Sequence, residues 1–180
     1  MNSDDAYLEN TIALVIAKIQ EGFPDVIYGN LIKERAFGTE IFTRIEKPAL
    51  KNMDQTMSIF HPAAFAKKEL FQMHGEFDLR FKLAADYHWF LKVYLAKATF
   101  KYIDAPLAKF SVGGVSNFSC ESYREAANFQ AELGLQSSVR MKELHGLCLK
   151  KQKRQRLIAM FANWPIVKQI YARRLKKRWN

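Results

Sequence analysis

The clearest hydrophobic pattern lies near the N-terminus, where apolar residues recur at helical spacing over residues 8–19. The Ser-Asp-Asp run at 3–5 supplies capping side chains ahead of them, and Gly22 followed by Phe23-Pro24 ends the pattern. The spacing predicts a helix with one face in the core. The residues of that face follow the i, i+4, i+7, i+8, i+11 repeat and are Leu8, Ile12, Val15, Ile16 and Ile19.

The next segments alternate between strand-like and helix-like patterns. Residues 25–34 (DVIYGNLIKE) predict a buried strand, and the segment around Gly38 predicts a turn into a second strand over 40–45 (EIFTRI). Two helices are predicted after them, a short one over 63–73 and a largely buried one over 86–97.

The pattern changes after residue 118. Residues 99–103 and 106–112 predict two more strands, and Gly113-Gly114 then interrupts the pattern. From Glu121 onward the chain is helical in character. The mixture of strands and helices up to residue 118 predicts an α/β fold.

Charge divides the chain in a similar way. The sequence has 28 basic and 18 acidic residues, a net charge of +10. Residues 140–180 hold thirteen Lys/Arg and one acid, whereas residues 1–139 hold fifteen basic and seventeen acidic side chains. We therefore predict a domain over 1–118 and a helical, basic C-terminal extension over 119–180. Such a tail attracts phosphate on nucleic acid or on an anionic membrane, and the alternative is a solvated charged helix.

Composition and cysteine use exclude several classes of protein. A hydrophobic fraction of 49% and a charged fraction of 26% are ordinary for a globular domain and exclude a disordered chain. No segment is apolar for long enough to span a membrane, and the acidic N-terminus is unlike a signal peptide. Cys120 and Cys148 form no CxxC or Cys/His pattern. We therefore expect neither a zinc site nor a disulfide scaffold, and a reducing, cytoplasmic setting.

Adjacent carboxylates at Asp4 and Asp5 are the first candidate for chemistry. Hard cations such as Mg²⁺ and Mn²⁺ prefer oxygen ligands, and one or two carboxylates plus substrate phosphates commonly hold them. The structural alternative is a helix cap that also interacts with the helix dipole.

A second candidate is Asp86, an acid inside an apolar stretch at the start of a predicted helix. Desolvation can raise the pKa of such a carboxyl group, which suits a general base. The alternative is again an N-cap. His88, two residues on, points elsewhere and is interpreted as a surface or packing residue.

A third candidate is the glycine pair Gly113-Gly114 with Ser116, which follows a predicted strand. Paired glycines let a backbone approach a ligand closely, so we include these residues as candidate substrate-binding positions. A plain loop is the alternative. His61, His74 and His145 show no metal-ligand spacing, and the sequence contains no GxSxG, P-loop or GxGxxG motif.

Taken in order, five motifs resemble the second half of a family 2 glycosyltransferase. The resemblance covers residues 2–118 and implies the acceptor-side portion of a truncated, Rossmann-like GT-A glycosyltransferase domain. The motifs are NSDDAY (2–7), PDVIYGN (24–30), HPAAFAKKELF (61–71), GEFDLRFKLAADYHWFLKV (75–93) and YIDAPLAKFSVGGVSN (102–117).

The resemblance also implies roles for single residues. Asp4 and Asp5 match the acidic motif that holds a divalent cation, Mn²⁺ or Mg²⁺, against the donor diphosphate, with Asp5 as the expected direct ligand. Asp86 matches the catalytic base, which takes the proton of an acceptor hydroxyl as its oxygen attacks the anomeric carbon with inversion. His61 matches a frequent histidine of the acceptor-side segment, although Pro62 stands where glutamine is common.

One departure from the family is large. The nucleotide-binding half of such enzymes precedes the acidic motif, and this chain begins one residue before it. We therefore expect a truncated chain that results from a gene fragment, a split gene or a miscalled start, and that binds nucleotide weakly on its own.

The implied function is transfer of a sugar from a nucleotide-sugar donor to a saccharide or lipid-linked acceptor, in cell-surface polysaccharide synthesis.

In the tail, Leu157, Phe161 and Trp164 form an apolar helical face among basic residues, which predicts an anionic-membrane contact through 140–180 at the cytoplasmic face of the membrane. Packing of that face against the domain is the alternative. A non-enzymatic basic protein that binds membranes or nucleic acid, or a fragment with no function, are the rival interpretations. No base-reading element is seen, so we expect no nucleic-acid partner.

Overall fold

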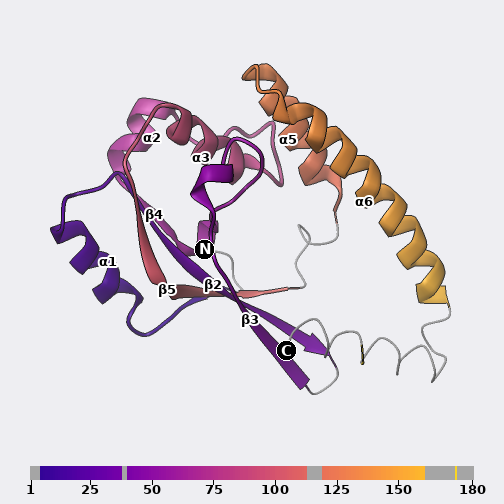
Figure 1. Ribbon diagram of the computed structural model, residues 1–180, viewed down its shortest axis with the longest axis horizontal. Helices are drawn as coiled ribbons and strands as arrows, with labels where there is room; N and C mark the ends of the chain where they lie inside the picture. The colour runs from indigo at the N-terminus through magenta and orange to yellow at the C-terminus, as the bar shows by residue number, and fades with distance from the viewer. Residues whose placement is uncertain (1–4, 38–39, 113–118, 161–172, 174–180) are drawn as a thin grey trace.

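A computed structural model of the chain describes residues 5–37, 40–112, 119–160 and 173. Its centre is a mixed sheet in the order β1-β5-β2-β3, with β4 also paired to β2. β2 and β5 run parallel, and the other pairs are antiparallel (Figure 1). The strands are β1 (Ala6–Tyr7), β2 (Val26–Phe37), β3 (Glu40–Glu46), β4 (Ala64–Ala66) and β5 (Phe100–Ser111).

The helices cover both faces of this sheet, so the predicted α/β class is confirmed. Val26 and Tyr28 of β2 belong to one buried cluster, together with residues of α2, α3 and α5. Ile27 and Leu31, on the opposite face of the strand, belong to a second cluster with Val15 of α1. The helices are α1 (Thr11–Gln20), α2 (Lys68–His74), α3 (Ala85–Leu95), α5 (Glu121–Glu132) and α6 (Ser137–Met160).

The first helix is shorter than predicted, and its predicted face is buried only in part. Val15 is buried and Ile19 packs against the same cluster, as predicted. α1 begins at Thr11, whose hydroxyl donates to the carbonyl of Leu107 at 2.5 Å, and Thr11 and Val15 are its buried residues. Ile12 and Ile16 are about half exposed, because they lie beside the buried positions Thr11 and Val15 on the helix surface. Residues 6–7 form β1, and the N-cap of α1 is Asn10. The prediction that Asp5 caps this helix is therefore wrong.

The hairpin of β2 and β3 is confirmed, but the segments around it differ in detail. The predicted helix over 63–73 contains β4 and begins only at Lys68, because residues 64–66 pair with the first residues of β2. The two strands predicted over 99–103 and 106–112 form the single strand β5. Its register with β2 shifts around Asn30, opposite Pro106, so the proline lies at an irregularity of the ladder.

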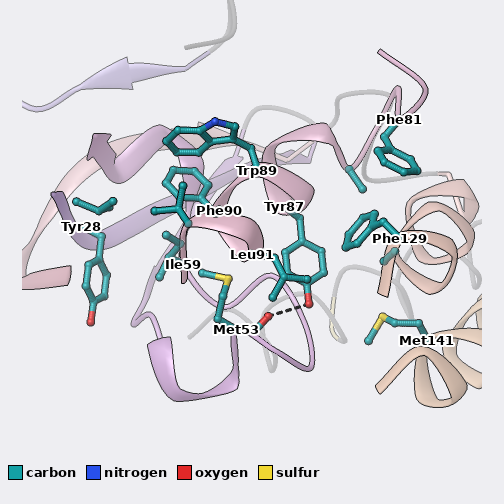
Figure 2. Close-up of a cluster of buried hydrophobic side chains, with 14 of the residues drawn as sticks. Tyr28, Met53, Ile59, Phe81, Tyr87, Trp89, Phe90, Leu91, Phe129 and Met141 are labelled. Carbon is teal, nitrogen blue, oxygen red and sulfur yellow. Dashed lines mark hydrogen bonds between the residues drawn. The ribbon is translucent and has the colours of Figure 1, made fainter. Parts of the chain in front are cut away.

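Helix α3 is buried around most of its circumference. Figure 2 shows Tyr87, Trp89, Phe90 and Leu91 from this helix among residues of several other segments. His88 is also buried, against the rings of Phe81 and Phe129, so it packs in the core. A helix that is enclosed on all sides holds its first turn in a fixed position.

Helix α5 packs into the same core, and α6 lies alongside α5 at the edge of the molecule (Figure 1). Ala126, Ala127 and Phe129 of α5 and Met141 of α6 are buried in the cluster that contains α3. A disulfide joins Cys120, at the start of α5, to Cys148 of α6. The expectation that these cysteines form no disulfide is therefore wrong. The two helices bring their Cα atoms to 5.7 Å, a separation that a disulfide spans.

None of the helices in the described part of the chain combines the length and the hydropathy that crossing a membrane requires. The apolar face predicted at Leu157, Phe161 and Trp164 lies outside the described side chains.

Candidate functional site

Asp86 and His61, predicted separately from the sequence, lie side by side in the structure. Nδ1 of His61 is 2.9 Å from Oδ2 of Asp86. His61 begins the 3₁₀ turn η2 (His61–Ala63), and Asp86 lies in the first turn of α3. Both side chains remain open to solvent, with 36% of His61 and 29% of Asp86 exposed. The pair is therefore accessible to a substrate.

Asp86 is not the N-cap of its helix. The N-cap is Ala84, which makes no side-chain capping bond. Oδ1 of Asp86 accepts a hydrogen bond from the backbone N–H of Tyr87 at 2.7 Å, while Oδ2 faces His61. The carboxylate is held at both oxygens, and each oxygen retains a lone pair for a further donor.

This contact determines where the proton of a neutral His61 ring resides. An ionised carboxylate only accepts hydrogen bonds, so Nδ1 carries the hydrogen and Nε2 is left as an acceptor. A carboxylate that orients a histidine in this way, or is itself oriented by one, is a common element of general-base catalysis. The pair thus offers two atoms able to receive a proton, Oδ2 of Asp86 and Nε2 of His61.

Buried hydrogen bonds fix the elements that carry this pair. The hydroxyl of Tyr87, the residue after Asp86, donates to the carbonyl of Met53 at 2.9 Å (Figure 2). The buried side-chain amide of Gln130 on α5 donates to the same hydroxyl at 2.8 Å. Desolvation raises the pKa of Tyr87 well above its usual range, so its hydroxyl remains a donor at all ordinary pH values.

The pair lies in the wall of a cavity of about 330 Å³, a volume within the range of small-molecule sites. Its lining is mostly apolar and aromatic, with few polar groups besides Asp86 and His61. The cavity is bounded by β2, β5, residues 56–62, the start of α3, α5 and α6. The lining residues are Leu31, Lys33, Thr56, Met57, Ile59, Phe60, His61, Pro62, Leu83, Ala84, Asp86, Tyr87, Phe110, Ser122, Tyr123, Ala126 and Met141.

The contribution of the C-terminal helices to this cavity was missed by the sequence analysis. Ser122, Tyr123 and Ala126 come from α5, and Met141 comes from α6. The basic composition of residues 140–180 led to the prediction of an exposed, phosphate-binding surface instead. The sequence signal for this contribution was the apolar residues Ala126, Phe129 and Met141, which pack in the cluster that contains α3.

Asp5 of the acidic motif is buried, with 8% of its surface exposed, and directly precedes β1. The next residue, Ala6, pairs with Lys109 of β5. Carboxylate oxygen is the donor type that Mg²⁺ and Mn²⁺ prefer, and the role of Asp5 toward such an ion stays a prediction. Within the described ranges, no group of three or more His, Cys, Asp or Glu side chains could hold a metal ion.

The remaining predicted positions, Asp4, Gly113, Gly114 and Ser116, lie outside the described residues. A larger hollow of about 450 Å³ lies beside the disulfide, between the start of α5 and α6. Its described lining includes His145 and Arg156 but none of the predicted site residues. We therefore identify the cavity at Asp86 and His61 as the candidate site.

Comparisons with known proteins give no assignment of this site: no protein-family model matches the chain, and no curated protein matches it at a significant level.

Proposed function

We propose that this chain is the acceptor-side portion of an inverting, metal-dependent glycosyltransferase of family 2, with Asp86 as the catalytic base. The observation that carries the proposal is the contact between His61 and Asp86 in the wall of a cavity of ligand size. The ordered sequence motifs supply the reaction class, because the same two residues occupy the motif positions of a base and an acceptor-side histidine.

In the proposed reaction, an acceptor hydroxyl enters the cavity and places its proton near Oδ2 of Asp86. The oxygen attacks the anomeric carbon of the donor sugar as the carboxylate takes the proton. The new C–O bond forms while the bond from that carbon to the donor phosphate breaks, and the nucleoside diphosphate leaves from the opposite face. Attack and departure on opposite faces invert the configuration. His61 orients the carboxylate through its Nδ1–H throughout.

A divalent cation belongs to this proposal, with Asp5 and Asp4 as the residues that would hold it. When bound, such an ion neutralises charge on the leaving diphosphate. The role of Asp5 toward the ion rests on the chemistry of its carboxylate and on its place next to β1.

The lining of the cavity suits an acceptor that has an apolar surface and a hydroxyl group. Phe60, Tyr87, Phe110 and Tyr123 offer aromatic faces, and the polar groups are few. Saccharide rings present apolar C–H faces, and lipid-linked acceptors add an apolar chain. We therefore propose a saccharide or lipid-linked saccharide as acceptor and a nucleotide sugar as donor.

The test uses purified protein that contains this chain. Release of nucleoside diphosphate is measured over a panel of nucleotide sugars with saccharide and polyprenyl-linked acceptors. Asp86→Asn is expected to lower kcat by about 10²–10⁴-fold with little change in donor binding. The matched control is Asp104→Asn, an exposed carboxylate that does not line the cavity. Near wild-type transfer by Asp86→Asn would contradict the assignment.

A second candidate function, which is compatible with the first, rests on α6. All seven basic side chains of this helix are exposed, and its one acid leaves a balance of +6. We propose that α6 binds anionic lipid head groups and holds the protein at a membrane surface. The seven residues are Arg140, Lys142, Lys150, Lys151, Lys153, Arg154 and Arg156.

A further inference from the structure

A buried carboxylate from α5 binds the chain segment that leads into Asp86. Oε1 of Glu125 accepts the backbone N–H of Lys82 at 3.0 Å. Oε2 accepts the N–H groups of Leu83 and Ala84, both at 2.9 Å. Glu125 is 6% exposed, so these three bonds form away from water. Three successive N–H groups that converge on one anion form a concavity of the kind that binds carboxylates and phosphates.

Helix α3 has no capping side chain at its N-cap position. The N-cap residue is Ala84, which has no side chain able to accept a hydrogen bond. The carboxylate of Glu125 binds the N–H of that residue and of the two residues before it. Its negative charge also lies at the end of the helix where the dipole favours an anion.

The same contact fixes the backbone at the candidate site. Leu83 and Ala84 line the cavity, and Asp86 follows two residues after the last bonded N–H group. We propose that Glu125 is a positioning residue, which sets the orientation of the Asp86 carboxylate against His61. The inference rests on the proposed function only for its catalytic consequence. The orientation itself can be measured without a substrate.

The test compares Glu125→Gln and Glu125→Ala with the wild-type chain. Glutamine keeps the shape but places an NH₂ group against a backbone N–H, and alanine leaves the three donors without the carboxylate. Glu121→Gln on the same helix is the matched control, because Glu121 is paired locally with Arg124 and lies outside the cavity. The first readout is amide hydrogen exchange at residues 82–84, expected to accelerate by about tenfold or more in both Glu125 variants.

The second readout is the ¹⁵N spectrum of the His61 imidazole, which reports whether the carboxylate still faces Nδ1. We expect the Glu125 variants to shift these signals toward those of Asp86→Asn, and Glu121→Gln to leave them unchanged. Sodium formate, but not sodium chloride at equal ionic strength, is expected to restore the wild-type signals in Glu125→Ala by filling the concavity. In the sugar-transfer assay of the proposed function, kcat is expected to fall and recover with the same variants while KM changes little.

Wild-type His61 signals in Glu125→Gln would overturn the inference, and so would a loss of folding stability that leaves those signals unmoved. If Glu125→Ala does not fold, Glu125→Gln decides. If no sugar transfer is found in any variant, the proposed function fails, while the exchange rates and His61 signals still decide the role of Glu125.

Discussion

Nδ1 of His61 contacts Oδ2 of Asp86 at 2.9 Å, and this contact makes the two residues one chemical unit. The pair contains two possible bases, and mutation can distinguish them. If Asp86 takes the proton and His61 only orients it, His61→Ala lowers kcat by less than Asp86→Asn does, which we place at about 10²–10⁴-fold.

The measurement is steady-state sugar transfer by the purified protein, with both variants assayed under the same conditions. A larger loss in His61→Ala than in Asp86→Asn would assign proton transfer to Nε2 of His61 instead. Asp104→Asn again serves as the control for removal of a carboxylate away from the cavity.

Gly29 of β2 is predicted to be intolerant of any side chain. A Cβ atom there would lie 2.6 Å from the side chain of Leu107 and 2.9 Å from the carbonyl oxygen of Ala105. The Gly29→Ala protein should therefore lose about 1–3 kcal/mol of unfolding free energy, because the tight packing of β2 on β5 has to shift.

Urea denaturation measures this loss, and Gly146→Ala on α6 is the matched control. Nothing lies within 4 Å of the added Cβ at Gly146, so this substitution should raise helix stability by up to about 1 kcal/mol. A Gly29→Ala protein as stable as the wild type would show that β2 and β5 are not packed this closely.

Asp25 is predicted to make stability depend on pH in the acid range. Hydrogen bonds from the backbone and side chain of Thr99, with Lys67 nearby, lower the pKa of Asp25 to about 2. Because the folded-state pKa lies below the unfolded value, the stabilisation is present above about pH 4 and is lost as the pH falls toward 2. For a partly exposed group we expect a contribution of about 1 kcal/mol.

Thermal or urea unfolding at pH 6 and at pH 3 measures this contribution. Asp25→Asn should lower stability at pH 6 and make the difference between the two pH values smaller. Thr99→Val removes the hydroxyl donor but keeps the backbone N–H, so an intermediate effect is expected. An unchanged pH dependence in Asp25→Asn would contradict the pairing.

Helix α6 is predicted to bind vesicles that contain phosphatidylglycerol and to ignore vesicles of phosphatidylcholine alone. Changing four of its basic residues to glutamine should weaken binding by about 10³-fold, since each contributes about 1 kcal/mol near an anionic surface. The four are Lys150, Lys151, Lys153 and Arg154. Added salt should weaken binding of the wild type. Four exposed lysines elsewhere provide the matched control when changed to glutamine: Lys51, Lys68, Lys97 and Lys101.

Co-sedimentation measures this binding, and a DNA duplex at the same ionic strength is the competing ligand. Binding to DNA with equal or higher affinity would assign α6 to nucleic acid. Equal indifference to both kinds of vesicle would contradict the membrane proposal.

The sequence predicted the elements that have a clear apolar pattern bounded by turn residues. The strand over 25–34, the hairpin that follows it and the helix over 86–97 are confirmed by β2, β3 and α3 within a few residues. These segments have alternating or continuous apolar residues with clear turn signals at their ends. The predicted face of α1 is buried only in part, because Thr11 makes a buried hydrogen bond to Leu107, a long-range contact that hydrophobic periodicity cannot indicate.

The candidate site was predicted as separate residues, and the structure joins two of them. Asp86 and His61 were identified from the sequence, but their contact depends on how η2 and α3 pack in three dimensions. Glu125 was not identified, because a glutamate on a predicted helix ordinarily faces solvent. In its buried position Glu125 accepts three N–H groups that lie 41–43 residues earlier in the chain, a contact that sequence periodicity does not indicate.

The long sequence separation between Glu125 and the segment it binds has a consequence for biosynthesis. During synthesis from the N-terminus, residues 82–84 leave the ribosome before α5, so their N–H groups cannot yet bind Glu125. The turn that carries Asp86 can adopt its final shape only after α5 has formed and docked. Maturation of the candidate site is therefore a late event in folding, and contacts of such high sequence separation form slowly. A nascent chain released before residue 125 would expose the core surface of α3 and be a target for chaperones and proteases.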